Sequence, residues 1–178
     1  DPALRQRAHD LLARETAADR AAVIEEFTAA LELPADTLRG REVFKKNCAS
    51  CHRVAGVGVD VAPDIADSYN KKPPQLLTDI LDPNRAIDSN YVSYTVITTD
   101  GQVLTGIIAS ETATAITLRQ QEDRQMTLLR DDIDELHSNG LSLMPEGLEQ
   151  NLSPQQMADV IRFIKNWRYL ESDIPLGE

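Results

Sequence analysis

The chain has 178 residues, the size of one domain with at most an appendage. Its 29 acidic and 18 basic residues give a formal net charge of −11, which argues against a nucleic-acid-binding surface and against docking on an anionic membrane. Hydrophobic residues make up 42% of the chain, enough for a buried core, and no apolar run of about 18 residues predicts a transmembrane helix.

Residues 3–33 are predicted to form two helices, because apolar residues recur there every three or four positions. Thr16 followed by Asp19 is a capping signal for the second helix, and Pro34 ends it. The first ten residues, DPALRQRAHD, are charged from the start and do not resemble a signal peptide. We expect that a signal has been removed or that the chain is cut from a longer protein.

A third helix, over residues 36–47, runs directly into Cys48-Ala49-Ser50-Cys51-His52, which holds both cysteines of the chain. Two cysteines this close cannot staple a fold as a multi-disulfide framework does, so they form a chemical site. C-x-x-C-H is the signature of covalent haem attachment, in which each thiol adds to one porphyrin vinyl group and the histidine ligates the iron. The motif therefore predicts one covalent haem c on Cys48 and Cys51, with His52 as the proximal ligand.

Three other interpretations of the motif stay open. A thioredoxin-like dithiol would lie at the start of a helix after a strand, whereas this motif follows a helix. A structural zinc site needs four ligands, and only His9 and His137 remain to complete it. The motif could also be a chance match in a surface loop. Haem has the further merit of explaining why aromatic residues are only 4% of the chain, since the macrocycle itself would fill the core.

Beyond the motif, a loop rich in Gly and Pro leads to a short helix over residues 75–81, which Asp82-Pro83-Asn84 ends. Residues 91–130 then alternate and are β-branched, which predicts an antiparallel meander of about four strands with a hairpin turn at Asp100-Gly101. An acidic segment and a loop follow. The last helix begins at Ser153, with Pro154 in its first turn and Trp167 in the core.

A six-coordinate haem needs a second axial donor opposite His52. Met126 lies in a predicted strand and Met157 on the apolar face of the last helix, so packing explains both. Met144 lies in a loop, before a proline that stiffens the backbone presenting its sulfur. We predict Met144 as the sixth ligand, with His137 as the alternative.

The chain resembles a class I cytochrome c, in which the first helix ends in C-x-x-C-H and a Met loop precedes the last helix. Gly40 and Phe44 resemble the Gly–aromatic pair by which the first helix crosses the last, with Phe163 and Trp167 as facing partners. Pro63 resembles the proline whose carbonyl accepts the Nδ1–H of the proximal histidine and so fixes its orientation.

A closer resemblance, over most of the chain, is to the haem-binding domain of planctomycete and verrucomicrobial type. Its landmarks are RGREVFKKNCASCH at 39–52, APDI at 62–65, ILDPNRAIDSNY at 80–91, TTDGQVLTGII at 98–108, SLMPEGL at 142–148 and LSPQQMADVIRFIK at 152–165. This resemblance implies a strand-rich insert, a place at the end of a large secreted protein, and a periplasmic or otherwise extracytoplasmic location.

We therefore expect a mainly α protein: a class I cytochrome c helical fold around a covalent haem, with a small antiparallel β-meander insert and an N-terminal helical extension. The expected boundaries are 1–34 for the extension, 35–172 for the cytochrome domain, about 91–135 for the insert and 173–178 for the tail. Arg85 and Tyr91 are expected to contact the haem propionates, through a guanidinium fork and a phenol hydroxyl.

The expected function is electron transfer without catalysis by the domain itself. A dehydrogenase domain would be the donor and another cytochrome the acceptor, and the acidic surface favours a partner with a basic docking patch. The alternative is a haem protein with an open or displaceable sixth site, acting as a ligand sensor or a peroxidase-like enzyme.

Overall fold

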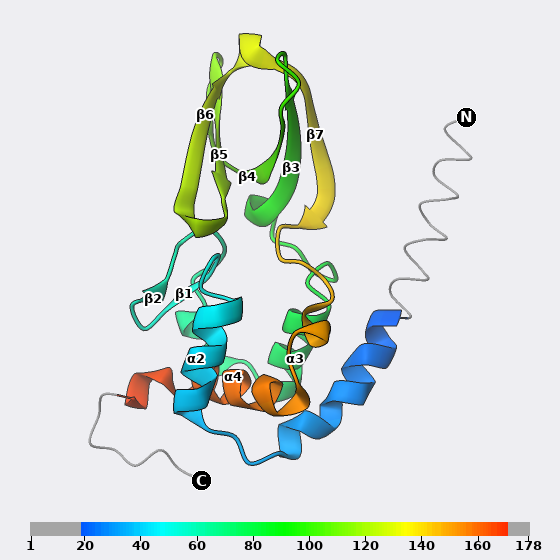
Figure 1. Cartoon of the computed structure of the whole chain (residues 1–178), viewed down its shortest axis with the longest axis vertical. Coiled ribbons are helices and arrows are strands. Elements are labelled where there is room, and N and C mark those ends of the chain that lie inside the picture. Colours follow the sequence, from blue (N-terminus) through cyan, green and yellow to red (C-terminus); the bar gives the residue numbers. More distant parts are fainter. Residues whose placement is uncertain (1–18, 171–178) are drawn as a thin grey trace.

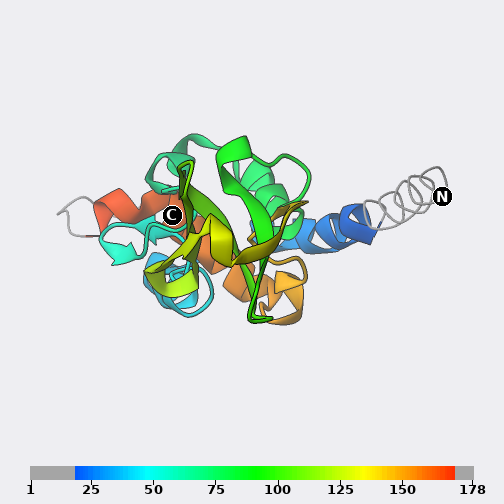
Figure 2. The ribbon, with the colours of Figure 1, turned by 90° about the horizontal axis from the view of Figure 1, so that it is seen from above.

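The computed structural model describes residues 19–170, which form a helical base beneath a tall antiparallel sheet (Figure 1). Seen from above, the sheet stands over the middle of the base, and the N-terminal helical segment extends to one side (Figure 2). The helices are residues 19–28, α2 (Thr37–Asn47), α3 (Pro73–Leu81) and α4 (Pro154–Asn166). Short 3-10 turns lie at Ala29–Glu32, Ala66–Asn70, Ser89–Tyr91, Gln121–Asp123, Arg130–Asp132, Leu148–Gln150 and Trp167–Tyr169. None of the helices in this part of the chain is long and apolar enough to cross a membrane.

The base is organised by the crossing of α2 and α4. A Cβ added to Gly40 would lie 1.9 Å from the carbonyl oxygen of Asp159, so only glycine allows the two backbones to approach this closely. Phe44 and Phe163 are fully buried beside the crossing, with ring centroids 5.4 Å apart. The contact that the sequence suggested between the first and last helices is therefore present.

A buried carboxylate joins the starts of α2 and α4. Asp159 is 2% exposed and accepts hydrogen bonds from the Asp36 backbone N–H (2.8 Å), from Arg39 Nε (2.8 Å) and from Gln155 Nε2 (3.1 Å). Asp36 in turn caps α2, because its side chain accepts from the Arg39 N–H. At the other helix, Ser153 and Gln156 form a complete capping box.

The helical residues 19–28 pack on the same core through Phe27, which is 6% exposed. Arg20 reaches across to Glu149, 2.9 Å away, and to the carbonyl of Leu81. This segment matches the second of the two helices predicted over residues 3–33, whereas the first helix and its Thr16 capping signal lie outside the described residues.

The upper part of the molecule is a five-stranded antiparallel sheet with strand order β6-β5-β4-β3-β7. Its strands are β3 (Val92–Thr98), β4 (Val103–Glu111), β5 (Ala115–Gln120), β6 (Arg124–Leu129) and β7 (Ile133–Ser142). A separate small core of Val96, Ile116 and Leu118 lies on one face of the sheet. A two-stranded hairpin, β1 (Arg53–Val54) with β2 (Val57–Gly58), follows the cysteine motif below it.

The expectation of a mainly α protein is wrong, because 28% of the structure is strand beside 44% helix, and five of the strands form one antiparallel sheet. Part of the error lies in residues 133–142, which we interpreted as an acidic segment and a loop. They form β7, which pairs with β3 along its length. Ile133 and Leu136 of β7 pack on the small core while the acidic side chains between them face solvent.

The insert leaves and re-enters the base at a single place. Val92, the first residue of β3, is paired with Ser142, the last residue of β7. The sheet therefore ends two residues before Met144. Met144 lies near the start of β3, where the chain leaves the helical base.

Candidate haem-binding site

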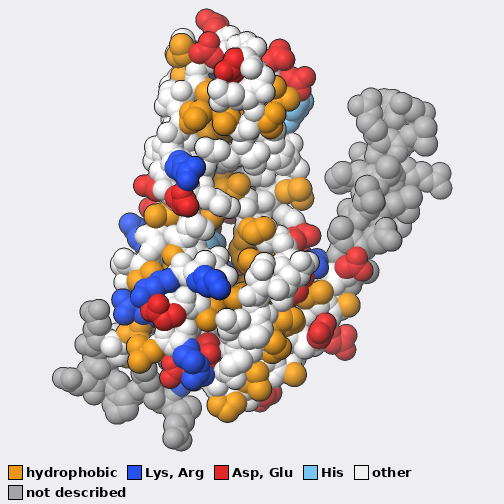
Figure 3. Space-filling view, in the orientation of Figure 1, with side chains coloured by type: hydrophobic (Ala, Val, Ile, Leu, Met, Phe, Trp, Pro, Cys, Tyr) orange, Lys and Arg blue, Asp and Glu red, His pale blue; other side chains and the backbone are white. Residues whose placement is uncertain are grey.

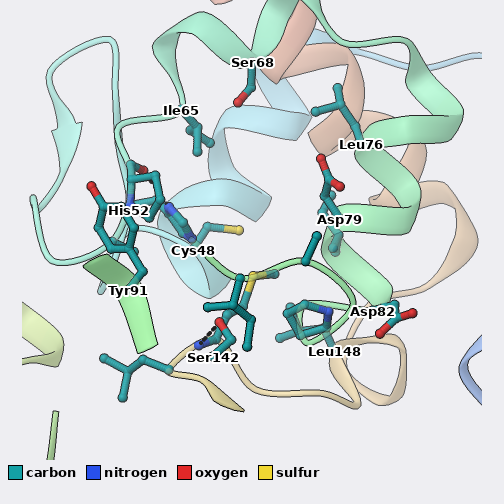
Figure 4. A pocket seen from close by; sticks show the side chains of 18 of the residues that line it. Cys48, His52, Ile65, Ser68, Leu76, Asp79, Asp82, Tyr91, Ser142 and Leu148 are labelled. Atoms are coloured by element: carbon teal, nitrogen blue, oxygen red, sulfur yellow. Dashed lines mark hydrogen bonds between the residues drawn. The ribbon is translucent and has the colours of Figure 1, made fainter. Parts of the chain in front are cut away.

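A cavity of about 340 Å³ lies between the helical base and the sheet. Orange apolar side chains line the hollow at the middle of the molecule (Figure 3). Cys48 and His52 enter it from one side, Leu76 and Asp79 of α3 from another, and Ser142 and Leu148 lie along its lower edge (Figure 4). The other lining residues include Ala62, Pro63, Ile65, Ile80, Arg85, Tyr91, Met144, Leu152, Val160 and Ile164.

The His52 ring is held by one hydrogen bond, with its Nδ1 2.8 Å from the carbonyl oxygen of Pro63. Because a carbonyl can only accept, Nδ1 carries the proton and Nε2 keeps its lone pair. Burial lowers the pKa of His52, and the Pro63 hydrogen bond only partly opposes this. The imidazole is therefore neutral at neutral pH, which is the state that ligates a metal.

The motif itself is a tight turn at the end of α2. Cys48 ends that helix, and its carbonyl accepts from the His52 N–H at 2.9 Å. The Cys51 carbonyl accepts from the N–H groups of Val61 and Ala62, at 3.1 and 2.9 Å. Gly58 closes the turn from outside, since a Cβ there would lie 2.0 Å from the His52 carbonyl oxygen. The positions of the motif residues are thus fixed by backbone contacts.

The two thiols differ in their surroundings. Burial raises the pKa of the Cys48 thiol to about 12, with a smaller contribution from Cys51. Burial also raises the pKa of Cys51, against the opposing effect of Ser50, and Cys51 is not among the residues that line the cavity. Both lie at the C-terminal end of α2, where the helix dipole disfavours a thiolate, so the site lacks the setting of a reactive dithiol.

Met144 lies in the loop between β7 and α4, half-buried, and lines the cavity. Its N–H donates to Ser142 Oγ at 3.1 Å. Met126 is 38% exposed on β6, and Met157 is fully buried in the core of the base. Among the three methionines, Met144 is therefore the one whose side chain reaches the cavity that His52 also lines.

His137, the alternative ligand, is not brought to the cavity. It is exposed on β7, where its Nε2 lies 2.6 Å from Glu135 Oε2. His137 is five residues before Ser142, the last residue of β7, which is a distance of roughly 16 Å along the strand at about 3.3 Å per residue. His9 lies outside the described residues.

Arg85 and Tyr91 both line the cavity, from the segment between α3 and β3. Arg85 is exposed and Tyr91 is half-buried. Tyr91 also lines a second, more polar cavity beside the sheet, together with Arg119. The part that Arg85 and Tyr91 play in holding propionates stays a prediction.

Sequence reasoning missed the contacts of Asn84 with the Met144 loop. Asn84, from the turn after α3, accepts from the Ser142 N–H at 2.8 Å, and its amide donates to Glu146 at 2.5 Å. The Asp-Pro-Asn sequence signalled a turn, but a partner 58 residues further along the chain leaves no local pattern.

A porphyrin is a broad apolar group with an iron at its centre, and this cavity fits one in two respects. Its wall is mainly aliphatic, and a neutral imidazole and a thioether, two axial ligand types known for haem iron, both reach it. Residues 37–103 match the Cytochrome c family model. This part of the chain therefore carries a covalently bound haem c and has the electron-transfer role of that family.

The family match covers 67 of the 178 residues, from the start of α2 to the first residue of β4. It includes the cysteine motif and Pro63, and it ends before Met144 and α4. A comparison with curated proteins finds no match. Met144 and most of the sheet therefore lie beyond the family match.

Proposed function

We propose that this protein is an electron-transfer domain of the planctomycete and verrucomicrobial type, with haem c attached to Cys48 and Cys51 and ligated by His52 and Met144. The bound haem would supply a one-electron ferric–ferrous couple. The observation that carries the proposal is the convergence of His52 and Met144, 92 residues apart in sequence, on one apolar cavity.

The protein's own residues would set the properties of this couple. The Pro63 carbonyl holds the His52 ring and keeps its proton on Nδ1, which makes Nε2 the nitrogen available to iron. The mainly aliphatic wall would keep water from a bound haem, and Arg85 and Tyr91, which both line the cavity, would hydrogen-bond its propionates. With both axial positions filled by protein, the domain would pass electrons without binding a substrate at iron.

We further propose that the domain works outside the cytoplasm as part of a larger oxidoreductase, with a dehydrogenase domain as donor and another cytochrome as acceptor. Cytochrome c domains are usually extracytoplasmic, which supports the location. We also propose that residues 1–34 form an N-terminal extension, residues 35–172 the cytochrome domain and residues 173–178 a tail.

The attachment is tested with the purified chain and a Cys48→Ser/Cys51→Ser double variant. The wild-type chain should stain for haem on a denaturing gel, and its haem should resist extraction into acidified butanone. The double variant should be colourless. Haem that extracts freely from the wild-type chain would show that it is not covalently bound, and the assignment of both cysteines would fail.

A further inference from the structure

We propose that Asn84 is a positioning residue that clamps the Met144 loop against the cavity; this rests on the proposed ligation of iron by Met144. The Asn84 side chain touches the loop on both sides of the methionine. Its Oδ1 accepts from the Ser142 backbone N–H at 2.8 Å, two residues before Met144. Its Nδ2 donates to Glu146 Oε1 at 2.5 Å, two residues after it.

These two contacts require both the carbonyl oxygen and the NH₂ group of the Asn84 side chain. A backbone N–H can only donate and an ionised carboxylate can only accept, so one contact needs the carbonyl of Asn84 and the other needs its NH₂ group. No other side chain of similar size offers an acceptor and a donor in this geometry. Aspartate would lack the donor, and leucine would lack both.

The clamp is anchored on a rigid part of the base. Asn84 follows α3, whose last residue, Leu81, is fully buried in the core. The turn is closed by hydrogen bonds from the Asp82 N–H to Thr78 and from the Arg85 N–H to Asp82, at 2.8 and 3.2 Å. A fixed side chain therefore holds a loop that has little regular structure of its own.

The loop also carries an internal contact that depends on the clamp. Ser142 donates its N–H to Asn84 and uses its Oγ to accept from the Met144 N–H at 3.1 Å. Releasing Asn84 removes one of the contacts that hold Ser142, which is also paired with Val92, and so weakens the support of the Met144 backbone. We expect the loop without the clamp to open roughly 10- to 100-fold more often, because two hydrogen bonds are lost and the one to Glu146 is weakened by exposure to solvent.

Three variants separate the clamp from a merely structural role. Asn84→Asp keeps the acceptor for Ser142 but places a second carboxylate against Glu146. Glu146→Gln keeps an acceptor for the Asn84 amide and is the matched control. The double variant restores the contact with its direction reversed, because the Gln NH₂ group donates to the new carboxylate.

The test is made on the haem-loaded protein, with imidazole as the competing ligand for ferric iron. The wild-type protein should show the far-red absorption band of a sulfur–iron bond and should bind imidazole slowly, at a rate set by loop opening. Asn84→Asp should bind imidazole at least tenfold faster, and its Ser142 and Met144 amide protons should exchange faster. Glu146→Gln should bind imidazole at the wild-type rate. The double variant should bind imidazole at nearly the wild-type rate.

Two failures are distinguishable. If the wild-type protein lacks the far-red band, Met144 does not ligate iron and the proposed function fails, while amide exchange still reports whether Asn84 holds the loop. If the band is present but Asn84→Asp binds imidazole at the wild-type rate, the clamp is refuted and the ligand assignment stands. A double variant as fast as Asn84→Asp alone would equally overturn the clamp.

Discussion

Gly40 is the residue on which the helical base depends most directly, because no other residue fits where α2 crosses α4. Gly40→Ala would place a Cβ 1.9 Å from a backbone oxygen and 2.8 Å from Phe163 Cβ, so the helices must move apart. We expect a loss of about 2–3 kcal/mol of unfolding free energy, at the upper end of overpacking effects, measured by denaturant titration.

Leu38→Ala, on the exposed side of the same helix, is the matched control for Gly40→Ala. Leu38 is 60% exposed, so its truncation should change the unfolding free energy by less than about 0.5 kcal/mol. If Gly40→Ala and Leu38→Ala changed the free energy of unfolding equally, the close approach of α2 and α4 at Gly40 would not limit the packing of the base.

Met144→Ala tests the sixth ligand. Loss of the thioether should abolish the far-red band, open the iron to water or carbon monoxide, and lower the reduction potential, since a thioether favours ferrous iron. The measurements are the ferric and ferrous spectra and a redox titration.

The other methionines and His137 are the controls for the ligand. Met126→Ala and Met157→Ala should keep the band, although Met157→Ala should cost about 2–5 kcal/mol because that side chain is fully buried. A protein that loses its sixth ligand in His137→Ala, and keeps it in Met144→Ala, would be bis-histidine. A wild-type protein that binds carbon monoxide readily would instead favour the sensor or peroxidase-like alternative.

Much of the site could be predicted from residues close together in sequence, since the cysteine motif carries its own chemistry. Met144 could be predicted only by elimination among the methionines, because its distance from His52 in space depends on the whole insert. The clamping role proposed for Asn84 could not be predicted, since its contacts join it to residues 58 and 62 positions further along the chain. Local motifs specify the chemistry of a site, whereas the residues that hold its parts together are specified by the fold.

At the scale of the elements, the contact of Asp159 with the start of α2 should make stability depend on pH. Burial alone would raise the pKa of Asp159, but the hydrogen bonds from Arg39, Asp36 and Gln155 outweigh it, and the pKa lies below its usual value. A carboxyl whose pKa is lower in the folded state stabilises the protein above its unfolded pKa of about 3.9. That stabilisation is lost as the pH falls through the folded pKa.

Asp159→Asn should therefore lower the free energy of unfolding by about 1–3 kcal/mol at pH 7. The range reflects a buried acceptor with donors from three residues, of which the Arg39 side chain is over half exposed. The difference from wild type should shrink as the pH falls below about 4, because the carboxyl of the unfolded wild-type chain then takes up a proton, which draws the equilibrium away from the folded, ionised form. Denaturant titrations at pH 7 and pH 3 measure both values. An equal difference at the two pH values would contradict the contribution of the charge.

The helices were easier to predict than the sheet for a physical reason. α2 and α4 carry their own caps, Asp36 and Ser153, and the sequence marks their starts to within a residue. β7 is acidic and contains Asn139 and Gly140, residues that are rare in strands. It is a strand because β3 offers it a partner, and that pairing joins residues more than 30 positions apart.

At the scale of the whole molecule, the negative charge is unevenly distributed. Residues 91–151 carry ten acidic and three basic side chains, whereas residues 37–90 and 152–170 together carry eight acidic and eleven basic ones. Blue basic side chains gather over α2 and the β1–β2 hairpin, and red acidic ones at the free end of the sheet (Figure 3). The basic docking patch expected of a partner would therefore complement the sheet, and not the surface beside the cysteine motif.

This distribution predicts how the protein reacts with a small anionic oxidant. Despite the net charge of −11, oxidation of the ferrous protein by ferricyanide should slow as salt is added, because the basic surface beside the motif attracts the anion. A Lys45→Glu/Lys46→Glu variant should react more slowly at low salt and show less salt dependence. A wild-type rate that rises with salt would mean that the net charge governs the encounter.

The pairing of Val92 with Ser142 also has a consequence for the order in which the protein folds. The helices form from neighbouring residues, whereas β3 and β7 meet only after the whole intervening segment has folded between them, and non-local strand pairing is the slower kind of event. The His52 side of the cavity is thus assembled early and the Met144 side late. During refolding we expect the iron to spend an interval with one protein ligand, whose length measures the folding time of the sheet.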